Sequence, residues 1–255
     1  MQLAYRKLGS GPPLIILHGL FGMSDNWLTI ARRIAAQHTV FLLDQRNHGD
    51  SPHSDAFSYE LLAEDLEAFI VQEDLGVVSV IGHSMGGKAA MCHALRYPQR
   101  VDKLVVVDIA PKAYYHPFFR RVLDFMMALD LSRFARRAEI DAAFAEVVPK
   151  PGVRQFILKN LQRTESGYRW QIHVQSLSEN LDRIFAAVGE GGRSWDKPAL
   201  FVRGGRSDYV LDEDEALIKT LFPQATLVTI PGASHWLHVD AEEILCGHLR
   251  AYLGC

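Results

Sequence analysis

The first 110 residues alternate between short, continuously apolar runs and longer stretches in which apolar positions recur at helical spacing. The apolar runs predict buried strands at residues 14–17, 39–43, 77–81 and 104–108. The helical patterns lie at about 26–36, 58–73 and 88–97. Because strands that are buried on both faces read as unbroken apolar runs, this alternation predicts a mostly parallel sheet flanked by helices.

The pattern changes after residue 110. Residues 111–193 are almost entirely helical in pattern, rich in Arg, Phe, Leu and Ala, and end at a glycine-rich run, 189–192. Strand patterns then return at 199–203 and 226–230, with helices near 212–221 and from residue 241. We therefore expect one α/β core, formed by residues 1–110 and 194–255, and an inserted helical cap, residues 111–193.

Composition narrows the class of protein. The 255 residues are 48% hydrophobic and 22% charged, with a formal net charge of -3, which suits one sizeable core and gives no electrostatic reason to bind nucleic acid. The three cysteines, Cys92, Cys246 and Cys255, fit neither a disulfide framework nor a zinc site. No run reaches transmembrane length, and the first residues lack an apolar signal core. We expect a cytoplasmic protein without a membrane span.

The strand at 77–81 runs into the pattern G-x-S-x-G at residues 82–86, and a helical pattern follows. This strand–turn–helix context is that of a nucleophile elbow, in which a serine is exposed on a sharp turn. The flanking glycines, Gly82 and Gly86, let the strand and the helix pack closely. Ser84 is therefore the predicted nucleophile, in preference to a serine in an ordinary turn.

A serine hydroxyl needs an adjacent base, which is itself oriented by an acid. Of the eleven histidines, His235 is the best candidate, because it follows the last predicted strand in a loop that can reach back over the sheet. His238 lies three residues further on and is expected to be a surface or supporting residue. The order serine, aspartate, histidine is that of α/β hydrolases.

Two aspartates are candidates for the acid. Asp208 follows the strand at 199–203, and Asp108 ends the strand at 104–108. Both lie at the carboxyl ends of parallel strands, where open α/β sheets build their sites. The pattern alone leaves the choice open.

The loop His18-Gly19 follows the first predicted strand and can present the backbone N–H of Leu20 beside that of Met85. Two such donors form an oxyanion hole. The polar run 44–51 is interpreted as a buried network around Asp44, Arg46 and Ser51 rather than as direct chemistry.

Further along the chain, several cap residues suit either an acyl pocket or the core of the cap: Tyr114, Tyr115, Phe118, Phe119, Met126 and Met127. Five arginines suit a solvated face, with a site for an anionic substrate tail as the alternative: Arg120, Arg121, Arg133, Arg136 and Arg137.

Together these motifs resemble the α/β-hydrolase superfamily and, within it, the bacterial YbfF-type esterases and their mitochondrial relatives. The runs that carry the resemblance are Leu17-His-Gly-Leu-Phe-Gly22, Asp44-x-Arg-Asn-His-Gly-x-Ser51, Gly82-His-Ser-Met-Gly-Gly87, Val107-Asp-Ile-Ala-Pro111 and Gly232-Ala-Ser-His-Trp236. The resemblance extends over essentially the whole chain.

The resemblance implies a carboxylesterase or thioesterase that uses no cofactor and no metal and acts on acyl esters, including acyl-coenzyme A. It also favours Asp108 over Asp208 as the acid. A haloperoxidase, a lactonase and a carbon–carbon bond hydrolase would use the same triad, and a hydrolase fold that only binds a ligand is the alternative of a different class.

Overall fold

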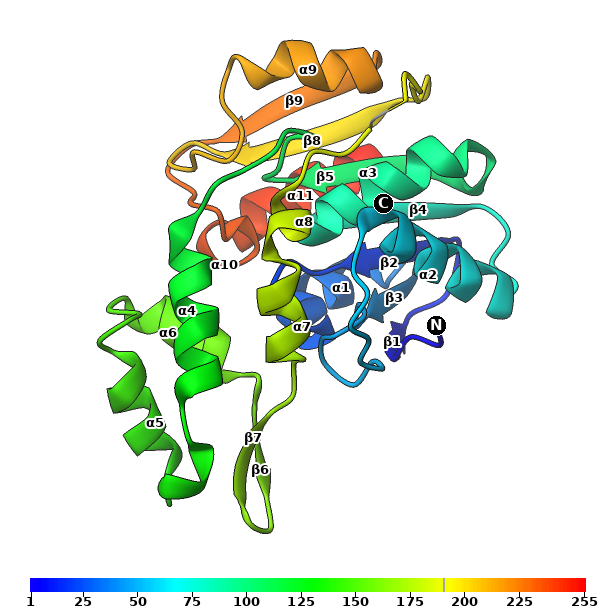
Figure 1. The fold of residues 1–255 in the computed structure, drawn as a ribbon. Helices are drawn as coiled ribbons and strands as arrows, with labels where there is room; N and C mark the ends of the chain where they lie inside the picture. The colour runs from blue at the N-terminus through cyan, green and yellow to red at the C-terminus, as the bar shows by residue number, and fades with distance from the viewer. Residues whose placement is uncertain (190) are drawn as a thin grey trace.

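The computed structural model describes residues 1–189 and 191–255, so Glu190, within the glycine-rich run 189–192, lies outside the described residues. Its centre is a seven-stranded sheet with the order β1-β3-β2-β4-β5-β8-β9 (Figure 1). The strands are β1 (Tyr5–Leu8), β2 (Pro13–Leu17), β3 (Thr39–Leu43), β4 (Val78–His83), β5 (Val101–Val107), β8 (Ala199–Gly204) and β9 (Ala225–Ile230). β1 pairs antiparallel with β3, and the other neighbours pair in parallel. The predicted α/β fold with a mostly parallel sheet is confirmed.

Alternate residues along the central strands belong to two separate apolar clusters. In β2, for example, Ile15 and Leu17 face one cluster and Leu14 and Ile16 face the other. The first cluster is covered by α2 (Tyr59–Gln72), α3 (Met85–Arg96) and α9 (Asp214–Leu221). The second is covered by α1 (Leu28–Ile34), α10 (Leu237–Asp240) and α11 (Glu242–Leu253). Burying both faces in this way explains the unbroken apolar runs, since each fully buried Leu or Ile contributes about 1.5–3 kcal/mol.

A segment that connects β5 to β8 forms a separate group of elements, which we call the inserted segment. It contains α4 (Pro117–Ala128), α5 (Arg137–Phe144), α6 (Pro151–Leu158), β6 (Leu161–Thr164), β7 (Gly167–Trp170), α7 (Val174–Glu179) and α8 (Leu181–Phe185). Figure 1 shows α4, α5, α6 and α7 grouped beside the sheet, with the β6–β7 hairpin extending away from it. Short 3-10 helices occur at Ser24–Trp27, Pro98–Arg100 and Leu131–Arg133.

Two strand features differ from the sequence prediction. The edge strand β1 was not predicted, because its four residues, Tyr-Arg-Lys-Leu, are largely exposed and form no apolar run. The stretch 111–193 was predicted to be almost entirely helical, but β6 and β7 form an antiparallel hairpin within it. Their side chains are only partly buried, so these strands also lack the apolar signal.

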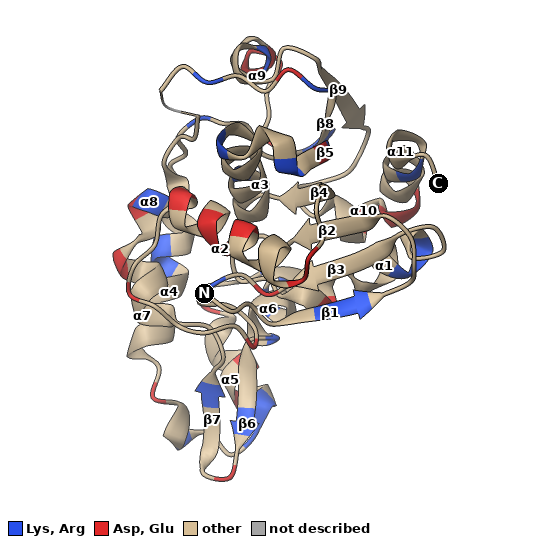
Figure 2. Ribbon diagram, turned by 90° about the vertical axis from the view of Figure 1, so that its right-hand side faces the viewer, with Lys and Arg blue, Asp and Glu red and all other residues tan. Residues whose placement is uncertain are grey.

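Charged residues are distributed over the whole fold (Figure 2). Acidic residues gather on α2, and basic residues lie on β1 and on the β6–β7 hairpin, as Figure 2 shows. In the described part of the chain, no helix is long and apolar enough to cross a membrane.

Candidate active site

Ser84 occupies a strained turn between β4 and α3. Its backbone has φ 54° and ψ -118°, a conformation that costs a non-glycine residue of the order of 1–3 kcal/mol. The turn is held because the Ser84 amide donates to the carbonyl of Val107 (3.0 Å). A Cβ on Gly82 would lie 2.2 Å from the carbonyl oxygen of Gly86, and one on Gly86 would lie 2.4 Å from that of Leu17. The two glycines are therefore sterically required, as the G-x-S-x-G pattern predicts.

His235 lies between Ser84 and Asp108. Its Nε2 is 3.1 Å from Ser84 Oγ, and its Nδ1 is 2.8 Å from Asp108 Oδ2. A carboxylate only accepts hydrogen bonds, so Nδ1 carries the proton and donates it to Asp108. Nε2 is then left to accept the hydroxyl proton of Ser84. This is the arrangement that a serine nucleophile needs.

Asp108 is fully buried, immediately after β5, and has a positive φ of 53°. Besides His235, it accepts hydrogen bonds from the backbone N–H of Gly204 (2.8 Å) and from the hydroxyl of Ser207. Asp208, the other predicted candidate, is exposed on the loop between β8 and α9 and lines a cavity instead. The geometry thus brings Asp108, and not Asp208, to the imidazole.

Two further residues support His235 and were not singled out by the sequence analysis. The ring of Tyr209 stacks on the imidazole, with centroids 3.7 Å apart and planes 14° apart. His83 Nε2 lies 2.9 Å from the carbonyl oxygen of His235 and donates to it. The sequence signal for each residue was its place beside a predicted site residue, since Tyr209 follows Asp208 and His83 precedes Ser84.

Of the two places expected for His238, at the surface or supporting the site, the structure shows the second, because His238 is buried behind His83. It stacks on the ring of Trp27, with centroids 4.9 Å apart, and packs edge-on against His83. Burial lowers its pKa to about 3, so it is a neutral packing group behind His83.

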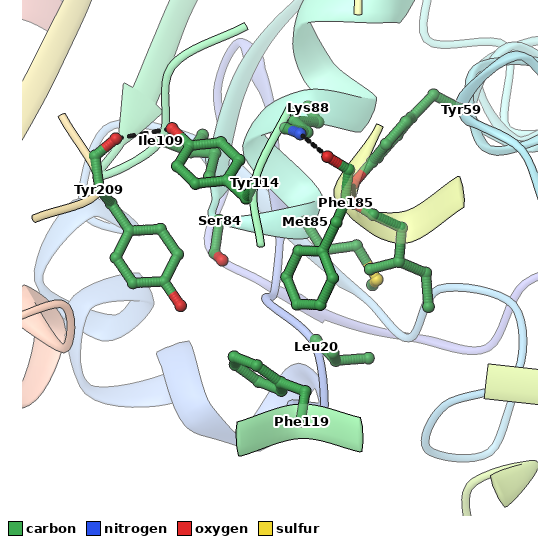
Figure 3. A pocket seen from close by; sticks show the side chains of 11 residues that line it. Leu20, Tyr59, Ser84, Met85, Lys88, Ile109, Tyr114, Phe119, Phe185 and Tyr209 are labelled. Carbon is green, nitrogen blue, oxygen red and sulfur yellow. Dashed lines mark hydrogen bonds between the residues drawn. The ribbon is translucent and has the colours of Figure 1, made fainter. Parts of the chain in front are cut away.

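Leu20 and Met85, the predicted oxyanion residues, both line a pocket of about 20 Å³ beside Ser84, which we call the small pocket (Figure 3). Among the described residues, neither backbone N–H donates a hydrogen bond to the protein. Such donors are available to a ligand. Two buried histidines fix the loop that carries Leu20. The amide of Phe21 donates to His48 Nε2 (3.3 Å), and the amide of Gln45 donates to His18 Nε2 (3.0 Å).

The polar run 44–51 forms the buried network that the sequence analysis predicted. Asp44 Oδ1 accepts from the amide of Ser24 (2.6 Å), and the Arg46 guanidinium donates to Asp65 (2.7 Å). The Ser51 hydroxyl donates to the carbonyl of Asp44 (2.5 Å). These contacts stabilise the loops under the site without reaching Ser84.

A second cavity, of about 590 Å³, is lined by Ser84 and His235, and we call it the large cavity. Its lining is mostly apolar and includes Phe118, Phe119, Val147, Val148, Val153, Phe156, Ile157 and Trp236. Arg121, Lys150, Arg206 and Asp208 also line it. Most of these residues come from the inserted segment, so that segment forms much of the cavity wall.

The six aromatic and methionine residues of the inserted segment that the sequence left undecided have different environments. Tyr114 lines the small pocket. Phe118 and Phe119 line the large cavity, whereas Met126 is buried in the core. Tyr115 and Met127 are exposed.

The five predicted arginines also differ in their surroundings. Arg121 lines the large cavity, and Arg120 donates to the carbonyl of Ser178 (2.8 Å). Arg136 pairs with Glu139, Arg137 donates to Gln155, and Arg133 is exposed.

Known proteins resemble this chain over most of its length. The family described as the alpha/beta hydrolase fold matches residues 12–145. The sn-1-specific diacylglycerol lipase ABHD11 of Danio rerio is 37% identical over 239 residues, covering 91% of this chain and 75% of that protein. Esterase YbfF of Escherichia coli (strain K12) is 35% identical over 242 residues, covering 94% of this chain and 92% of that protein. A solved structure described as a marine microorganism esterase is 43% identical, with a TM-score of 0.96, covering 98% of this chain and 99% of that one. The chain therefore belongs to the α/β-hydrolase family.

Proposed function

We propose that this protein is a serine carboxylesterase in which Ser84 forms an acyl-enzyme, His235 transfers protons and Asp108 orients His235. At the coarser level, it is a carboxylic ester hydrolase, like the esterase and lipase relatives that match nearly its whole length. The finer proposal rests on one observation above all. Ser84 Oγ, the His235 ring and Asp108 Oδ2 are joined at 3.1 and 2.8 Å, and Ser84 and His235 line an apolar cavity.

In the first half of the reaction, Ser84 Oγ attacks the carbonyl carbon of the ester while His235 Nε2 takes the hydroxyl proton. The negative charge that develops on the carbonyl oxygen is stabilised by the N–H groups of Leu20 and Met85. Loss of one such donor typically costs about 3–4 kcal/mol of transition-state stabilisation. His235 then gives its proton to the leaving alcohol as the carbon–oxygen bond breaks.

In the second half, a water molecule gives a proton to His235 and attacks the acyl-enzyme. The Ser84 Oγ–carbon bond breaks, Ser84 recovers its proton from His235, and the carboxylic acid is released. Asp108 accepts the hydrogen bond from Nδ1 and stabilises the imidazolium that forms twice in each cycle. Its complete burial and its two other donors, Gly204 N–H and the Ser207 hydroxyl, support this role.

The large cavity supports an apolar, chain-like substrate. Each methylene that it buries contributes up to about 0.8 kcal/mol, so kcat/KM should rise up to about fourfold per added carbon until the cavity is full. We extend the proposal to acyl thioesters, including acyl-coenzyme A, because Arg121, Lys150 and Arg206 in the cavity lining suit an anionic leaving group.

The inserted segment is suited to act as a cap over the nucleophile. We propose residues 111–193 as this cap, because Phe118, Phe119 and Phe156 face the cavity beside the nucleophile. An apolar wall there excludes bulk water from the acyl-enzyme and selects substrates by shape.

The test uses the wild-type protein and Ser84→Ala side by side. We expect a fluorophosphonate to label the wild type once per chain and to leave Ser84→Ala unlabelled. Nitrophenyl esters from acetate to decanoate, and acyl-coenzyme A thioesters of the same lengths, then measure the chain-length and leaving-group preferences. Turnover that persists in Ser84→Ala would refute the nucleophile.

The remaining outcomes separate the alternatives. A protein that the fluorophosphonate does not label is a ligand-binding hydrolase fold and not an enzyme of this kind. A labelled protein that is inactive on the whole panel is a lactonase, a haloperoxidase or a carbon–carbon bond hydrolase.

A further inference from the structure

Lys88 is a buried lysine one helical turn after Ser84, with 1% of its surface exposed. Its Nζ donates hydrogen bonds to the carbonyl oxygens of Ala186 (2.5 Å) and Lys112 (2.9 Å). It also reaches the carbonyl oxygen of Phe185 at 3.4 Å, the contact drawn in Figure 3. The ammonium also lies 4.7 Å from the ring centroid of Tyr114. Among the described residues, it makes no ion pair with a carboxylate.

The three carbonyls lie on the two connections between the sheet and the inserted segment. Lys112 lies on the outgoing connection, between β5 and α4, whereas Phe185 ends α8 and Ala186 follows it on the return. The two connections are also bonded to each other, since the amide of Tyr114 donates to the carbonyl of Phe185 (2.8 Å). Lys88 thus joins both connections to the helix that begins at the nucleophile.

Burying a lysine without a carboxylate partner is costly, and here burial lowers the pKa of Lys88 to about 7. An apolar side chain of similar length would fill the same space without this cost. The donors are therefore the property that distinguishes lysine at this position. An amine that has lost its proton still has two N–H groups, enough for the short bonds to Lys112 and Ala186.

We propose that Lys88 is a positioning residue that joins both connections of the cap to the nucleophile helix and so maintains the substrate-binding shape of the small pocket. Phe185 carries one of the bonded carbonyls, Ile184 precedes it, and the amide of Tyr114 donates to the Phe185 carbonyl; all three residues line that pocket beside Ser84. This inference rests on the proposed function of Ser84.

The role predicts an effect on substrate binding more than on the chemical step. His235 is held by Asp108 at Nδ1 and by His83 at its carbonyl, and neither contact involves Lys88. Removing the donors of Lys88 should therefore loosen the pocket wall while the catalytic contacts remain. A change in uniform binding appears in KM and leaves kcat nearly unchanged.

The experiment compares Lys88→Met with Lys103→Met. Lys103 is a matched control, because its Nζ also donates to two backbone carbonyls, those of Tyr252 (3.1 Å) and Leu253 (2.7 Å), away from the site. We expect Lys88→Met to raise KM for nitrophenyl butyrate about tenfold with kcat changed less than about threefold, and Lys103→Met to leave both unchanged. Fluorophosphonate titration counts the active molecules in each preparation.

Hydrogen exchange supplies a second readout. The amides of Tyr114 and Val188, which bond across the two connections to Phe185 and Pro111, should exchange at least about tenfold faster in Lys88→Met than in the wild type. If Lys88→Met does not fold, Lys88→Gln keeps a shorter neutral donor and should show the same changes at smaller amplitude.

An unchanged KM with unchanged exchange in an active Lys88 variant would overturn the inference. So would equal changes in KM and exchange in the Lys88 and Lys103 variants, because those would indicate a general loss of stability. A wild type that is neither labelled nor active would instead contradict the proposed function itself, so the two failures are distinct.

Discussion

The choice between the two aspartates gives the sharpest prediction. Asp108 Oδ2 lies 2.8 Å from His235 Nδ1, and the other oxygen accepts from the amide of Gly204. In Asp108→Asn the side-chain oxygen should stay with Gly204, since that amide can only donate. The new NH2 group then faces His235 Nδ1, which must become an acceptor, and Nε2 carries the proton.

An imidazole in that tautomer cannot accept the Ser84 proton. Enzymes that suffer this change lose on the order of 10⁴ in kcat, which corresponds to about 5.4 kcal/mol at about 1.36 kcal/mol per tenfold. Asp208 is exposed and makes no hydrogen bond to His235, so Asp208→Asn should change kcat by less than about threefold.

The assay measures kcat on nitrophenyl butyrate for the wild type and both variants, with thermal unfolding as the control for folding. A large loss in Asp208→Asn together with near wild-type activity in Asp108→Asn would refute the reasoning. Comparable modest losses in both would refute the idea of one dominant acid.

Two further predictions follow from the same contacts. Ser207→Ala removes a hydrogen-bond donor to Asp108 and should lower kcat about tenfold. A hydrogen bond to a charged group contributes about 1.5–3 kcal/mol, and only part of this acts through His235. An unchanged kcat would contradict this role of Ser207. Burial lowers the pKa of His18 to about 4 and of His48 to about 3, so between these values and about 6.5 the unfolded chain binds more protons than the native one. The free energy of unfolding should therefore fall as the pH drops from 7.5 to 5, by up to about 2 kcal/mol for each histidine. Urea unfolding at both pH values should show a smaller fall for His48→Gln than for the wild type. An equal fall in the two proteins would show that His48 does not contribute.

Much of this site could be predicted because its signals are local. The strand, the two glycines and the helix around Ser84 are contiguous in the sequence, and His235 directly follows a recognisable strand. The choice between the two acids depends instead on contacts between residues that are far apart in the sequence. Both aspartates follow a parallel strand, and what separates them in the structure is the contact of Asp108 with His235, 127 residues away in the sequence.

The strands that were missed have a related explanation. β1 and the β6–β7 hairpin are short and partly exposed, so their pairing leaves no apolar run to be recognised. The contacts of Lys88 with Lys112 and Ala186 are likewise tertiary, and a lysine in a helical pattern normally indicates a solvated position.

The positive φ angles of Ser84 and Asp108 have a consequence for how this protein can change. These residues follow adjacent strands, β4 and β5, and each occupies a backbone conformation that a glycine would adopt without strain. At both positions the residue that suits the backbone best would remove a functional group from the site. Selection for thermal stability alone would therefore act against activity at these two positions, and a stabilised variant of this esterase should take its substitutions elsewhere in the fold.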